Sequence, residues 1–552
     1  MKIFFLFLIS LSLVACQQQP HSQHAVASAH PIATQAGINI LNQGVNAFDA
    51  AVSVSATLAV VEPYSSGMGG GGFWLLQRSS DNKSVMIDGR EVAPLKAQRD
   101  MYLDKQGNVI PKLSIDGPLS AGIPGQPAAL VHINKKYGKL PLKAVFAPAV
   151  EAAREGFPVT EHYRRMAKFR LDALRASEDA ARIFLQNNEV PQLGYLIKQP
   201  DLADTLEIMT ELGAEGFYKG GLAWGLVEGT RNAGGIWSLT DLENYKVIER
   251  QPLTGQFGEY KVTAVPPASS GGVVILSMLN MLEQHNWSKL NHVDQKHLLI
   301  EVMRRAYRDR AVYLGDTDFV QVPIKKLTSK EYAKELGSNI DMNMATASAM
   351  LPGIDDQPKG NHTTHFSIID KQGNRVAATL SINYPFGSCF VPPGTGILLN
   401  DEMDDFSSKP GTPNAYGLVG AEANAIEPGK RMLSSMSPTI IESEDKLAIL
   451  GTPGGSRIIT MVLHSILGVS QDESAEAIVK APRFHHQYLP DEIQYEPNAL
   501  TTSEIEVLGK RGHTLRELKN SYGNMHVVIV DKKTKRVTAA SDPRGEGAAV
   551  VQ

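Results

Sequence analysis

The 552-residue sequence has very little cysteine: only Cys16 and Cys389 occur. Two cysteines cannot build a disulfide framework, so the fold must be held by its core. The sequence also lacks a basic excess, because 54 lysines and arginines stand against 58 aspartates and glutamates. This balance indicates neither nucleic acid nor an anionic membrane surface as a partner. What remains is a chain with 43% hydrophobic residues, which is typical of a globular protein with a sizeable core.

The N-terminus has the pattern of an export signal. Met1-Lys2 is followed by an apolar run from Ile3 to Val14, which is too short to span a bilayer, and no later stretch is apolar enough to do so. The run ends in Leu13-Val14-Ala15-Cys16, which resembles the lipobox of bacterial lipoproteins. We therefore expect a signal peptide at 1–15 and a polar tether at 16–29 that is lipidated on Cys16. The alternative is a plain signal peptide that contains a cysteine.

The main candidate for chemistry is Thr363, in Asn361-His362-Thr363-Thr364-His365. The hydroxyl of an internal threonine has no base beside it, whereas a threonine at a chain terminus can use its own α-amine. The preceding stretch, 337–360, is polar and contains Pro and Gly, as in exposed segments where a cut is tolerated. A cut after His362 would turn Thr363 into a nucleophile. The alternative is a pair of ordinary strand threonines.

Hydrophobic periodicity predicts a mixed α/β protein. Helical patterns cover 31–43, 46–61, 126–157 (two helices), 293–314 and 458–469. Two strands, 364–370 and 375–383, flank Lys371-Gln372-Gly373-Asn374 and predict a hairpin. Folding about this turn places Ser381 and Asn383 opposite Thr363. A second hairpin, 526–531 with 537–541, is predicted near the end of the sequence.

Three other stretches could bind charged groups. Arg90 could hold a carboxylate by two parallel hydrogen bonds, or it could be a solvated surface charge. Ser434-Ser435 could bind a carboxylate or cap a turn. Gly454-Gly455 precedes a helical run and could form an anion site or an ordinary helix cap. A lone Cys389 is more typical of a small packed residue than of a nucleophile.

In their order along the chain, these stretches resemble the motifs of bacterial γ-glutamyltranspeptidases, which belong to the N-terminal nucleophile hydrolase superfamily. The resemblance is carried by HPIATQAG (30–37), EPYSSGMGGGGF (62–73), REVAP (90–94), TTHFSIIDKQGNRVAATLSINYPFG (363–387), LLNDEMDDFS (398–407), SSMSPT (434–439) and GTPGGSRI (451–458). It implies a four-layer αββα sandwich and a precursor that cleaves itself between His362 and Thr363. A large subunit, 30–362, would stay with a small subunit, 363–552, of 552 − 362 = 190 residues.

The resemblance also implies what the site does. Thr363 would attack the γ-glutamyl amide of glutathione or another γ-glutamyl compound, and water or an amino-acid or peptide acceptor would resolve the γ-glutamyl-enzyme. Gly454 and Gly455 resemble the oxyanion hole. No cofactor or metal is implied, and His485-His486 would bind a metal only if carboxylates converged on them.

Each substrate-binding position is carried over residue by residue. In the family the donor α-carboxylate is held where this chain has Arg90, Ser434 and Ser435, and the α-ammonium where it has Asn383, Glu402 and Asp405. Ser381 stands where the family usually has threonine, so the hydroxyl is kept while the stiffening methyl is lost. Residues 409–424 resemble the loop that covers the pocket in many members, with Tyr416 as its capping aromatic.

Two alternatives stay open. A β-lactam side-chain acylase of the same superfamily, acting on glutaryl or cephalosporin substrates, would have no use for an ammonium-binding carboxylate at Asp405. A non-enzymatic surface lipoprotein would need a broken nucleophile, whereas Thr363 is intact. We expect an exported protein, either facing the periplasm or an outer-membrane lipoprotein of a Gram-negative bacterium. Its contact with the membrane would be through the lipid anchor only.

Overall fold

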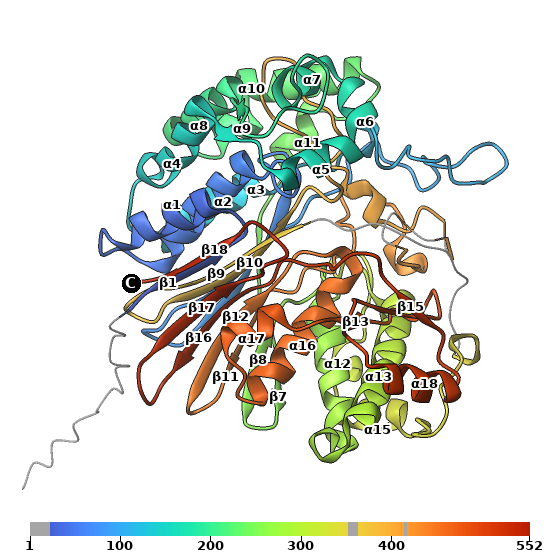
Figure 1. Ribbon diagram of the computed structural model, residues 1–552. Helices are drawn as coiled ribbons and strands as arrows, with labels where there is room; N and C mark the ends of the chain where they lie inside the picture. The colour runs from blue at the N-terminus through green and yellow to red at the C-terminus, as the bar shows by residue number, and fades with distance from the viewer. Residues whose placement is uncertain (1–22, 352–362, 410, 413, 415–416) are drawn as a thin grey trace, which may run out of the picture.

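The computed structural model describes residues 23–351, 363–409, 411, 412, 414 and 417–552. Two β-sheets lie face to face, and helices cover the outer face of each (Figure 1). This confirms the predicted αββα sandwich. Cys16, His362 and Tyr416 lie outside the described residues. In the part of the chain that is described, no helix is long and apolar enough to cross a membrane.

Both sheets are antiparallel throughout. The first has seven strands in the order β18 (Ala548–Val551), β1 (Ala25–Ser28), β9 (Thr364–Ile369), β10 (Arg375–Ser381), β2 (Gly71–Gln77), β3 (Ser84–Gly89) and β6 (Ile248–Arg250). The second has six, in the order β17 (Val537–Ser541), β16 (His526–Asp531), β12 (Lys446–Gly451), β11 (Thr439–Glu442), β8 (Tyr260–Ala264) and β7 (Leu253–Phe257). The four strands of the two predicted hairpins are therefore present as β9, β10, β16 and β17.

Two groups of helices form the outer layers. The helices on the outer side of the first sheet include α1 (Pro31–Leu41), α2 (Ala47–Val61), α3 (Gln126–Tyr137) and α4 (Leu142–Glu155). Farther from the sheet lie α5 (Glu161–Phe169), α6 (Leu171–Arg175), α7 (Glu178–Phe184), α8 (Pro200–Leu212), α9 (Glu215–Tyr218), α10 (Gly220–Asn232) and α11 (Leu239–Asn244). The second is covered by α12 (Gly271–Gln284), α13 (His292–Tyr313), α14 (Ile324–Leu327), α15 (Lys330–Gly337), α16 (Ile458–Ser470), α17 (Ala475–Lys480) and α18 (Thr502–Lys510). Short strands and turns complete the fold: β4 (Phe157–Pro158), β5 (Leu196–Ile197), β13 (Phe484–His485), β14 (Ile493–Tyr495), β15 (Leu515–Glu517), and the 3₁₀ turns η1 (Pro118–Ser120), η2 (Trp287–Lys289), η3 (Ser348–Met350), η4 (Glu402–Asp405), η5 (Glu422–Asn424) and η6 (Gly455–Arg457).

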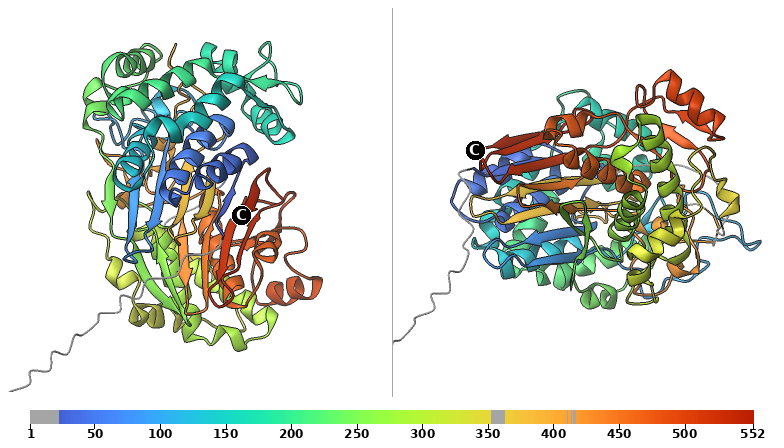
Figure 2. Two further views of the ribbon diagram at one scale, coloured as in Figure 1. Left: turned by 90° about the vertical axis from the view of Figure 1, so that its left-hand side faces the viewer. Right: turned by 90° about the horizontal axis from the view of Figure 1, so that it is seen from below.

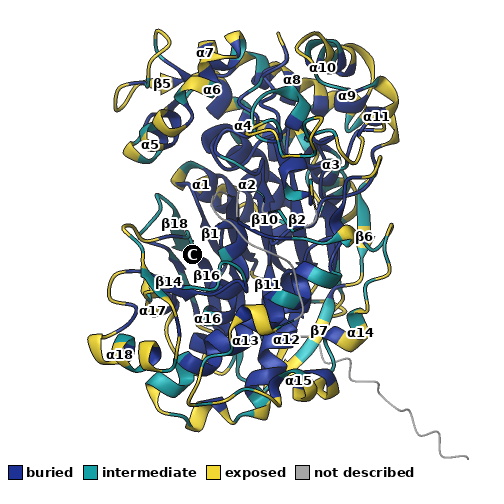
Figure 3. Ribbon diagram, turned by 90° about the vertical axis from the view of Figure 1, so that its right-hand side faces the viewer, coloured by how far each residue is buried: buried dark blue, intermediate teal, exposed yellow. Residues whose placement is uncertain are grey.

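Helix α2 shows how the sequence builds a buried layer. Asn46 caps its N-terminus, because its side-chain oxygen accepts the backbone N–H groups of Phe48 and Asp49 at 3.1 and 3.0 Å. The helix is Ala- and Val-rich with no charged face, and all its residues are buried between the first sheet and its neighbouring helices (Figure 3). The small side chains let it pack closely on both sides. The predicted helix at 46–61 is confirmed, with Asn46 as its cap.

The tether expected to reach residue 29 ends earlier than predicted. Ala25–Ser28 form strand β1, which is buried and paired on one side with β18 and on the other with β9. The prediction missed it because four small residues carry no alternating pattern. They form a strand because two neighbouring strands, far away in sequence, satisfy both of their backbone edges.

The N-terminal part of the chain, 23–351, and the C-terminal part, 363–552, both contribute strands to both large sheets, alternating in the first and lying side by side in the second (Figure 2). Four strand pairings join the two parts: β1 with β18, β1 with β9, β2 with β10, and β8 with β11. Neither part alone contains all the strands of either large sheet. A backbone cut between the two parts would therefore leave them held together by both sheets and by their cores.

Candidate active site

Thr363 directly precedes β9, and only 6% of the residue is exposed. It lines a pocket with about 280 Å³ of empty space. The pocket brings together residues from seven separate segments of the sequence. It is lined by Arg90, Thr363, Ser381, Asn383, Asp405, Leu418, Ser434, Ser435, Met436, Gly455 and Ile458. Most of the predicted site residues thus lie around one cavity, and Glu402 contacts Arg90 behind it.

The β9–β10 ladder places Ser381 beside Thr363. Leu380 pairs with Thr364, so the next residue of β10 faces the one before β9. The Ser381 hydroxyl oxygen accepts the backbone N–H of Asn383 at 2.8 Å. Asn383 has a φ of 70°, a left-handed conformation that asparagine tolerates better than most residues. Its side-chain amide donates to the Asp401 carbonyl at 3.0 Å, which fixes the end of the strand at the pocket.

Arg90 is buried among carboxyl groups. Its two Nη atoms donate to Glu402 Oε2 and Asp405 Oδ2, both at 2.5 Å, and its Nε donates to the Met432 carbonyl at 3.3 Å. Glu91 Oε2 lies 3.6 Å from Nη1. Burial raises the pKa of both Glu402 and Glu91, while the charge of Arg90 opposes both shifts. The side of the pocket at Arg90 therefore holds one permanent cation and several carboxyl groups.

This pairing differs from the substrate-binding roles expected from the sequence. The sequence predicts Arg90 on a substrate carboxylate and Glu402 with Asp405 on a substrate ammonium, whereas here these three side chains bind one another. The assignment of each group to one end of the substrate stays a prediction.

Arg310 is a site residue that sequence reasoning missed. It lies on α13, a helix expected only as scaffold, and its Nη2 donates to Ser435 Oγ at 3.1 Å while its Nε donates to Ser270 Oγ at 3.0 Å. Burial lowers its pKa to about 10, so it is still charged at pH 7. Arg310 thus places a second positive charge behind the serine pair. Nothing in the sequence distinguishes it from the other arginines of the same helix.

The two serines are held from both sides. Ser434 Oγ accepts the N–H of Met436 at 3.1 Å, and its carbonyl accepts the Ser270 N–H at 2.8 Å. Ser435 Oγ is free to donate its proton into the pocket, because it accepts from Arg310. The serine pair is therefore a potential donor surface for an anion.

Gly454 and Gly455 form the turn into η6 and α16. Their φ angles are 146° and 55°, values that residues other than glycine rarely adopt. A Cβ on Gly454 would also meet Met461 Cε at 2.5 Å. Gly455 lines the small pocket and Gly454 lines a second, larger one, and Thr363 lines both. The glycine pair therefore lies where its backbone can approach a group bound at Thr363.

Glu62 is buried on the other side of Thr363. Its Oε2 accepts the Thr364 hydroxyl at 2.6 Å, and only 4% of the residue is exposed. Burial raises its pKa from the ordinary value of 4.5 to about 8, against the effect of hydrogen bonds from Thr364 and Ser65 and with a smaller contribution from Glu546. At pH 7 most copies are thus protonated.

Residues considered for other chemistry are occupied elsewhere. Cys389 is 1% exposed, and burial raises the pKa of its thiol to about 12, so it supplies little thiolate at neutral pH. His485 contacts Thr460 and Gln487, and His486 contacts Asp491. Across the described stretches of the chain, no three His, Cys, Asp or Glu side chains are grouped as metal ligands would be.

A buried threonine at the head of a central strand, in an αββα sandwich, defines the class of N-terminal nucleophile hydrolases. The sequence profile of the family described as Gamma-glutamyltranspeptidase matches residues 33–552. The glutathione hydrolase proenzyme of Escherichia coli K12 is 42% identical over 95% of this chain and 90% of its own length. That of Pseudomonas aeruginosa is 40% identical over 96% and 94%. The chain therefore belongs to the gamma-glutamyltranspeptidase family.

Solved structures give the same class. A cephalosporin acylase from Bacillus halodurans superposes with a TM-score of 0.83 at 26% identity, over 96% of both chains. A γ-glutamyltranspeptidase chain from Helicobacter pylori superposes with a TM-score of 0.58 at 39% identity. That match covers 94% of the H. pylori chain but 59% of this one. The resemblance named from the seven sequence motifs is thus confirmed.

The raised pKa of Glu62 predicts a pH-dependent effect of Glu62→Gln on stability. In the unfolded chain the carboxyl ionises above its ordinary value of 4.5, whereas in the folded protein it stays protonated until about pH 8. Wild type therefore loses up to a few kcal/mol of stability, in order of magnitude, as the pH rises from 5 to 8. Glutamine is neutral throughout, so the melting temperature of Glu62→Gln relative to wild type should be higher at pH 8 than at pH 5. Exposed Glu517→Gln is the control, and an equal difference at both pH values for Glu62→Gln would contradict the pKa assignment.

Proposed function

We propose that the protein is a self-cleaving γ-glutamyltransferase and glutathione hydrolase in which Thr363 is the nucleophile. One observation carries the proposal: Thr363 shares a small pocket with a buried arginine, two serine hydroxyls and an acidic side chain. These groups complement an α-amino acid head, which has one carboxylate and one ammonium. Membership of the gamma-glutamyltranspeptidase family and relatives named glutathione hydrolase proenzyme agree with this chemistry.

Self-cleavage would come first and need no other protein. The Thr363 hydroxyl attacks the carbonyl carbon of His362, and the acyl group moves from the nitrogen to the oxygen of Thr363. Water then hydrolyses the ester, which frees the hydroxyl and leaves an α-amine on Thr363. The two products would be a large subunit ending at His362 and a small subunit of 552 − 362 = 190 residues. The interleaved sheets support their staying together, and so does the H. pylori relative, whose matched chain corresponds to 59% of this one.

Turnover would use the freed amine as base. The amine takes the proton of the Thr363 hydroxyl as the oxygen attacks the γ-carbonyl carbon of the donor. Backbone N–H groups at Gly454 and Gly455 would stabilise the oxyanion. Collapse expels the leaving amine, which takes the proton back from the Thr363 ammonium. Water, or the amine of an amino acid or peptide, then attacks the ester in the same way and releases glutamate or a new γ-glutamyl amide.

Donor recognition would be an exchange of partners. Arg90 forms ion pairs with Glu402 and Asp405. An α-carboxylate would bind Arg90 and the hydroxyls of Ser434 and Ser435, and an α-ammonium would take over Asp405 and Glu402 with Asn383. Ser381 would hold the amine of Thr363 in place. Leu418, from the expected covering loop, lines the same pocket, and Tyr416 is proposed as the aromatic residue over it.

One prediction of the proposed function concerns processing of the precursor. Wild type should give two bands on a denaturing gel and one species on gel filtration, because the two parts share both sheets. Thr363→Ala lacks the attacking hydroxyl and should stay a single full-length band. Thr363→Ser keeps a hydroxyl and serves as the control that still cleaves. Cleavage of Thr363→Ala as in wild type would rule out self-processing by this residue.

Another prediction concerns the preference of the enzyme among donor substrates. Wild type should hydrolyse a γ-glutamyl anilide in preference to a glutaryl anilide, which lacks the α-amine. Asp405→Asn removes a charge from the pocket and should reduce that preference by about 100-fold, since an unpaired buried ammonium costs roughly 2–5 kcal/mol. The ratio of the two kcat/KM values is the measurement. The neighbouring Asp404→Asn, whose carboxylate accepts the Ser114 hydroxyl at 2.7 Å outside the pocket, should keep the preference.

A cephalosporin acylase is the second candidate, because such an enzyme shares the fold with a TM-score of 0.83. That similarity rests on 26% identity, well below the 42% shared with the E. coli glutathione hydrolase proenzyme. The carboxyl groups at Arg90 also favour a donor with an amine. Preference for the glutaryl anilide in wild type would reverse this choice. Turnover of neither anilide would favour the non-enzymatic lipoprotein.

We also propose that the protein is exported and held on a membrane by a lipid on Cys16. The support is the sequence pattern at 1–16, which ends in the lipobox-like Leu13-Val14-Ala15-Cys16. The anchored protein would face the periplasm, on the inner or outer membrane of a Gram-negative bacterium. Strand β1 begins at Ala25, and His24 before it already exchanges backbone hydrogen bonds with Gln552, so the proposed tether is the stretch from Cys16 to the residue before His24.

A further prediction tests the proposed lipid anchor on Cys16. Cells fed radiolabelled palmitate should label wild type, which should then fractionate with membranes. Cys16→Ala should be unlabelled, because it removes the only thiol that could become the acylated N-terminus. Cys389→Ala is the matched control, since that thiol is buried in the fold. Equal labelling of wild type and Cys16→Ala would exclude this anchor.

A further inference from the structure

The motif at 62–73 has no role in the mechanism proposed above, although it lies against both strands that carry the site. Its last part enters strand β2, where Gly71 pairs with Ser381 of β10. Its first residue, Glu62, ends helix α2, and the carbonyl of Glu62 accepts the Ser65 N–H at 2.9 Å. The backbone of Glu62 is therefore fixed beside the first sheet.

In the part of the chain that the structure describes, the start of β9 has a strand neighbour on one edge only. Strand β10 pairs with β9 from Thr364 onward, whereas β1 pairs with it only from Phe366 onward. Self-cleavage would turn this start into a free chain end, because Thr363 would lose its bond to the residue before it. A chain end keeps one position only where further contacts tie it down.

The side chains of Thr364 and His365 supply such contacts on the two faces of the sheet, because successive residues of a strand point to opposite faces. On the face toward the second sheet, His365 Nδ1 lies 2.8 Å from Thr379 Oγ1. On the other face, at the end of α2, the Thr364 hydroxyl donates to Glu62 Oε2 at 2.6 Å. Thr364 and Glu62 are only 0% and 4% exposed, so water has little access to this hydrogen bond.

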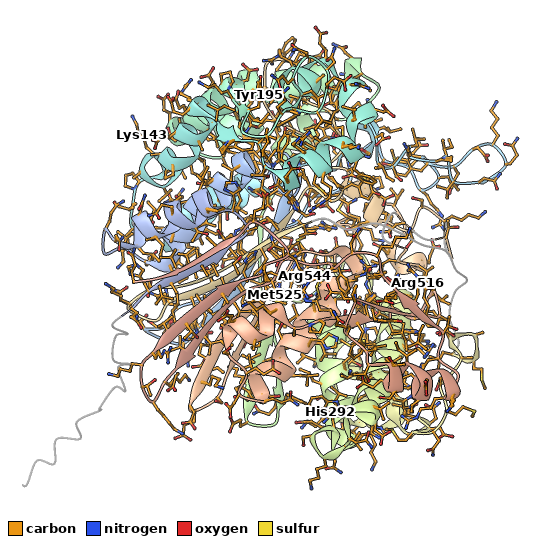
Figure 4. The ribbon with its side chains drawn as sticks, in the orientation of Figure 1. Lys143, Tyr195, His292, Arg516, Met525 and Arg544 are labelled. Atoms are coloured by element: carbon orange, nitrogen blue, oxygen red, sulfur yellow. The ribbon has the colours of Figure 1, made fainter. Side chains whose placement is uncertain are left out.

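The carboxyl of Glu62 forms no ion pair within the described stretches of the chain. Arg544, which is labelled in Figure 4, donates to Glu496 and Asp542 instead. Burial, with a smaller contribution from Glu546, raises the pKa of Glu62 to about 8, so most copies are protonated at pH 7. A glutamine in this place would have the same shape and the same neutral charge, and its amide oxygen could accept the same hydroxyl.

We infer that Glu62 is a positioning residue for the nucleophile: through the Thr364 hydroxyl it holds the start of β9, and so Thr363, in place at the pocket. The inference rests on the proposed role of Thr363 and deepens it. In the precursor this contact aligns the Thr363 hydroxyl with the carbonyl carbon that it attacks. In the processed enzyme it aligns the same hydroxyl with the γ-carbonyl carbon of the donor. A misplacement of about 1 Å can lower such a rate roughly 100-fold.

The groups proposed to bind the donor are held independently of this contact. Arg90 is paired with Glu402 and Asp405. Neither Glu62 nor Thr364 is among the described residues that line the small pocket. Loss of the contact should therefore change turnover more than donor binding.

The test removes the contact from each side. Glu62→Ala removes the acceptor, Thr364→Val removes the donor hydroxyl, and Glu62→Gln keeps an acceptor oxygen. A further variant combines Glu62→Ala with Thr364→Val. Thr57→Val is the matched control, because it removes a buried hydroxyl of helix α2 that donates to the Ser53 carbonyl at 2.8 Å and not to β9.

Hydrolysis of γ-glutamyl p-nitroanilide gives kcat and KM, calculated per amount of small subunit on a denaturing gel, so that unprocessed precursor is not counted. Glu62→Ala and Thr364→Val should each lower kcat roughly 10- to 100-fold and slow self-cleavage, while KM stays within about twofold of wild type. Glu62→Gln and Thr57→Val should keep the kcat of wild type, whatever their melting temperatures. The double variant should be no slower than the slower single variant, because both changes remove one and the same contact.

A kcat within about twofold of wild type in both Glu62→Ala and Thr364→Val would overturn the inference. Losses that multiply in the double variant, or a loss in Glu62→Gln as large as in Glu62→Ala, would overturn it as well. If Glu62→Ala does not accumulate as folded protein, the kcat of Thr364→Val decides, since valine keeps the shape of threonine. Lack of anilide hydrolysis by processed wild type would instead refute the proposed function itself.

Discussion

Strand β9 is the element on which the site depends. It lies inside the first sheet between β1 and β10, so its backbone is held by β10 from Thr364 onward and by β1 from Phe366 onward. It also faces the second sheet, where the ring of His365 fills the space that a side chain at Gly451 would occupy, with Cε1 2.1 Å from the ideal Cβ position. A residue placed directly before such a strand has a fixed position, whether or not the chain continues before it. Thr363 can therefore gain a free amine without losing its alignment with Ser381 or with the glycine turn.

The electrostatics of the small pocket follow from burying charges that must later bind a substrate. An arginine 1% exposed, as Arg90 is, would be very costly without counter-charges. Glu402 and Asp405 supply them. A zwitterionic donor offers one charge of each sign, so it can replace both halves of that pairing without leaving a buried ion unpaired. Arg310, behind Ser435, adds positive charge on the side where a carboxylate would lie.

Much of this could be predicted from the sequence, for physical reasons that differ from place to place. The β9–β10 hairpin was predictable because strand alternation and a Gly-Asn turn are local signals, and its register then placed Ser381 at Thr363. Helix α2 was predictable from its long run rich in Ala and Val. Strand β1 was not, since its pairing partners are β18 and β9, hundreds of residues away. The same limit hid Arg310 and the second cavity, which depend on side chains from α13, α5 and the 518–524 segment meeting in space. The mutual pairing of Arg90, Glu402 and Asp405 was also invisible, because sequence motifs show which charges are present and not which of them are in contact.

Strand β1 also determines where the two ends of the folded chain lie. His24 and Gln552 exchange backbone hydrogen bonds at 2.7 and 3.0 Å, and β18 runs antiparallel to β1. A turn of two or three residues could therefore join residue 552 to residue 24 as an ordinary β-hairpin. Such a circularly permuted gene could begin translation at Thr363 and end before it, with the same strand neighbours throughout. Removal of an initiator methionine would then create the threonine terminus, so that catalysis could be studied apart from self-cleavage.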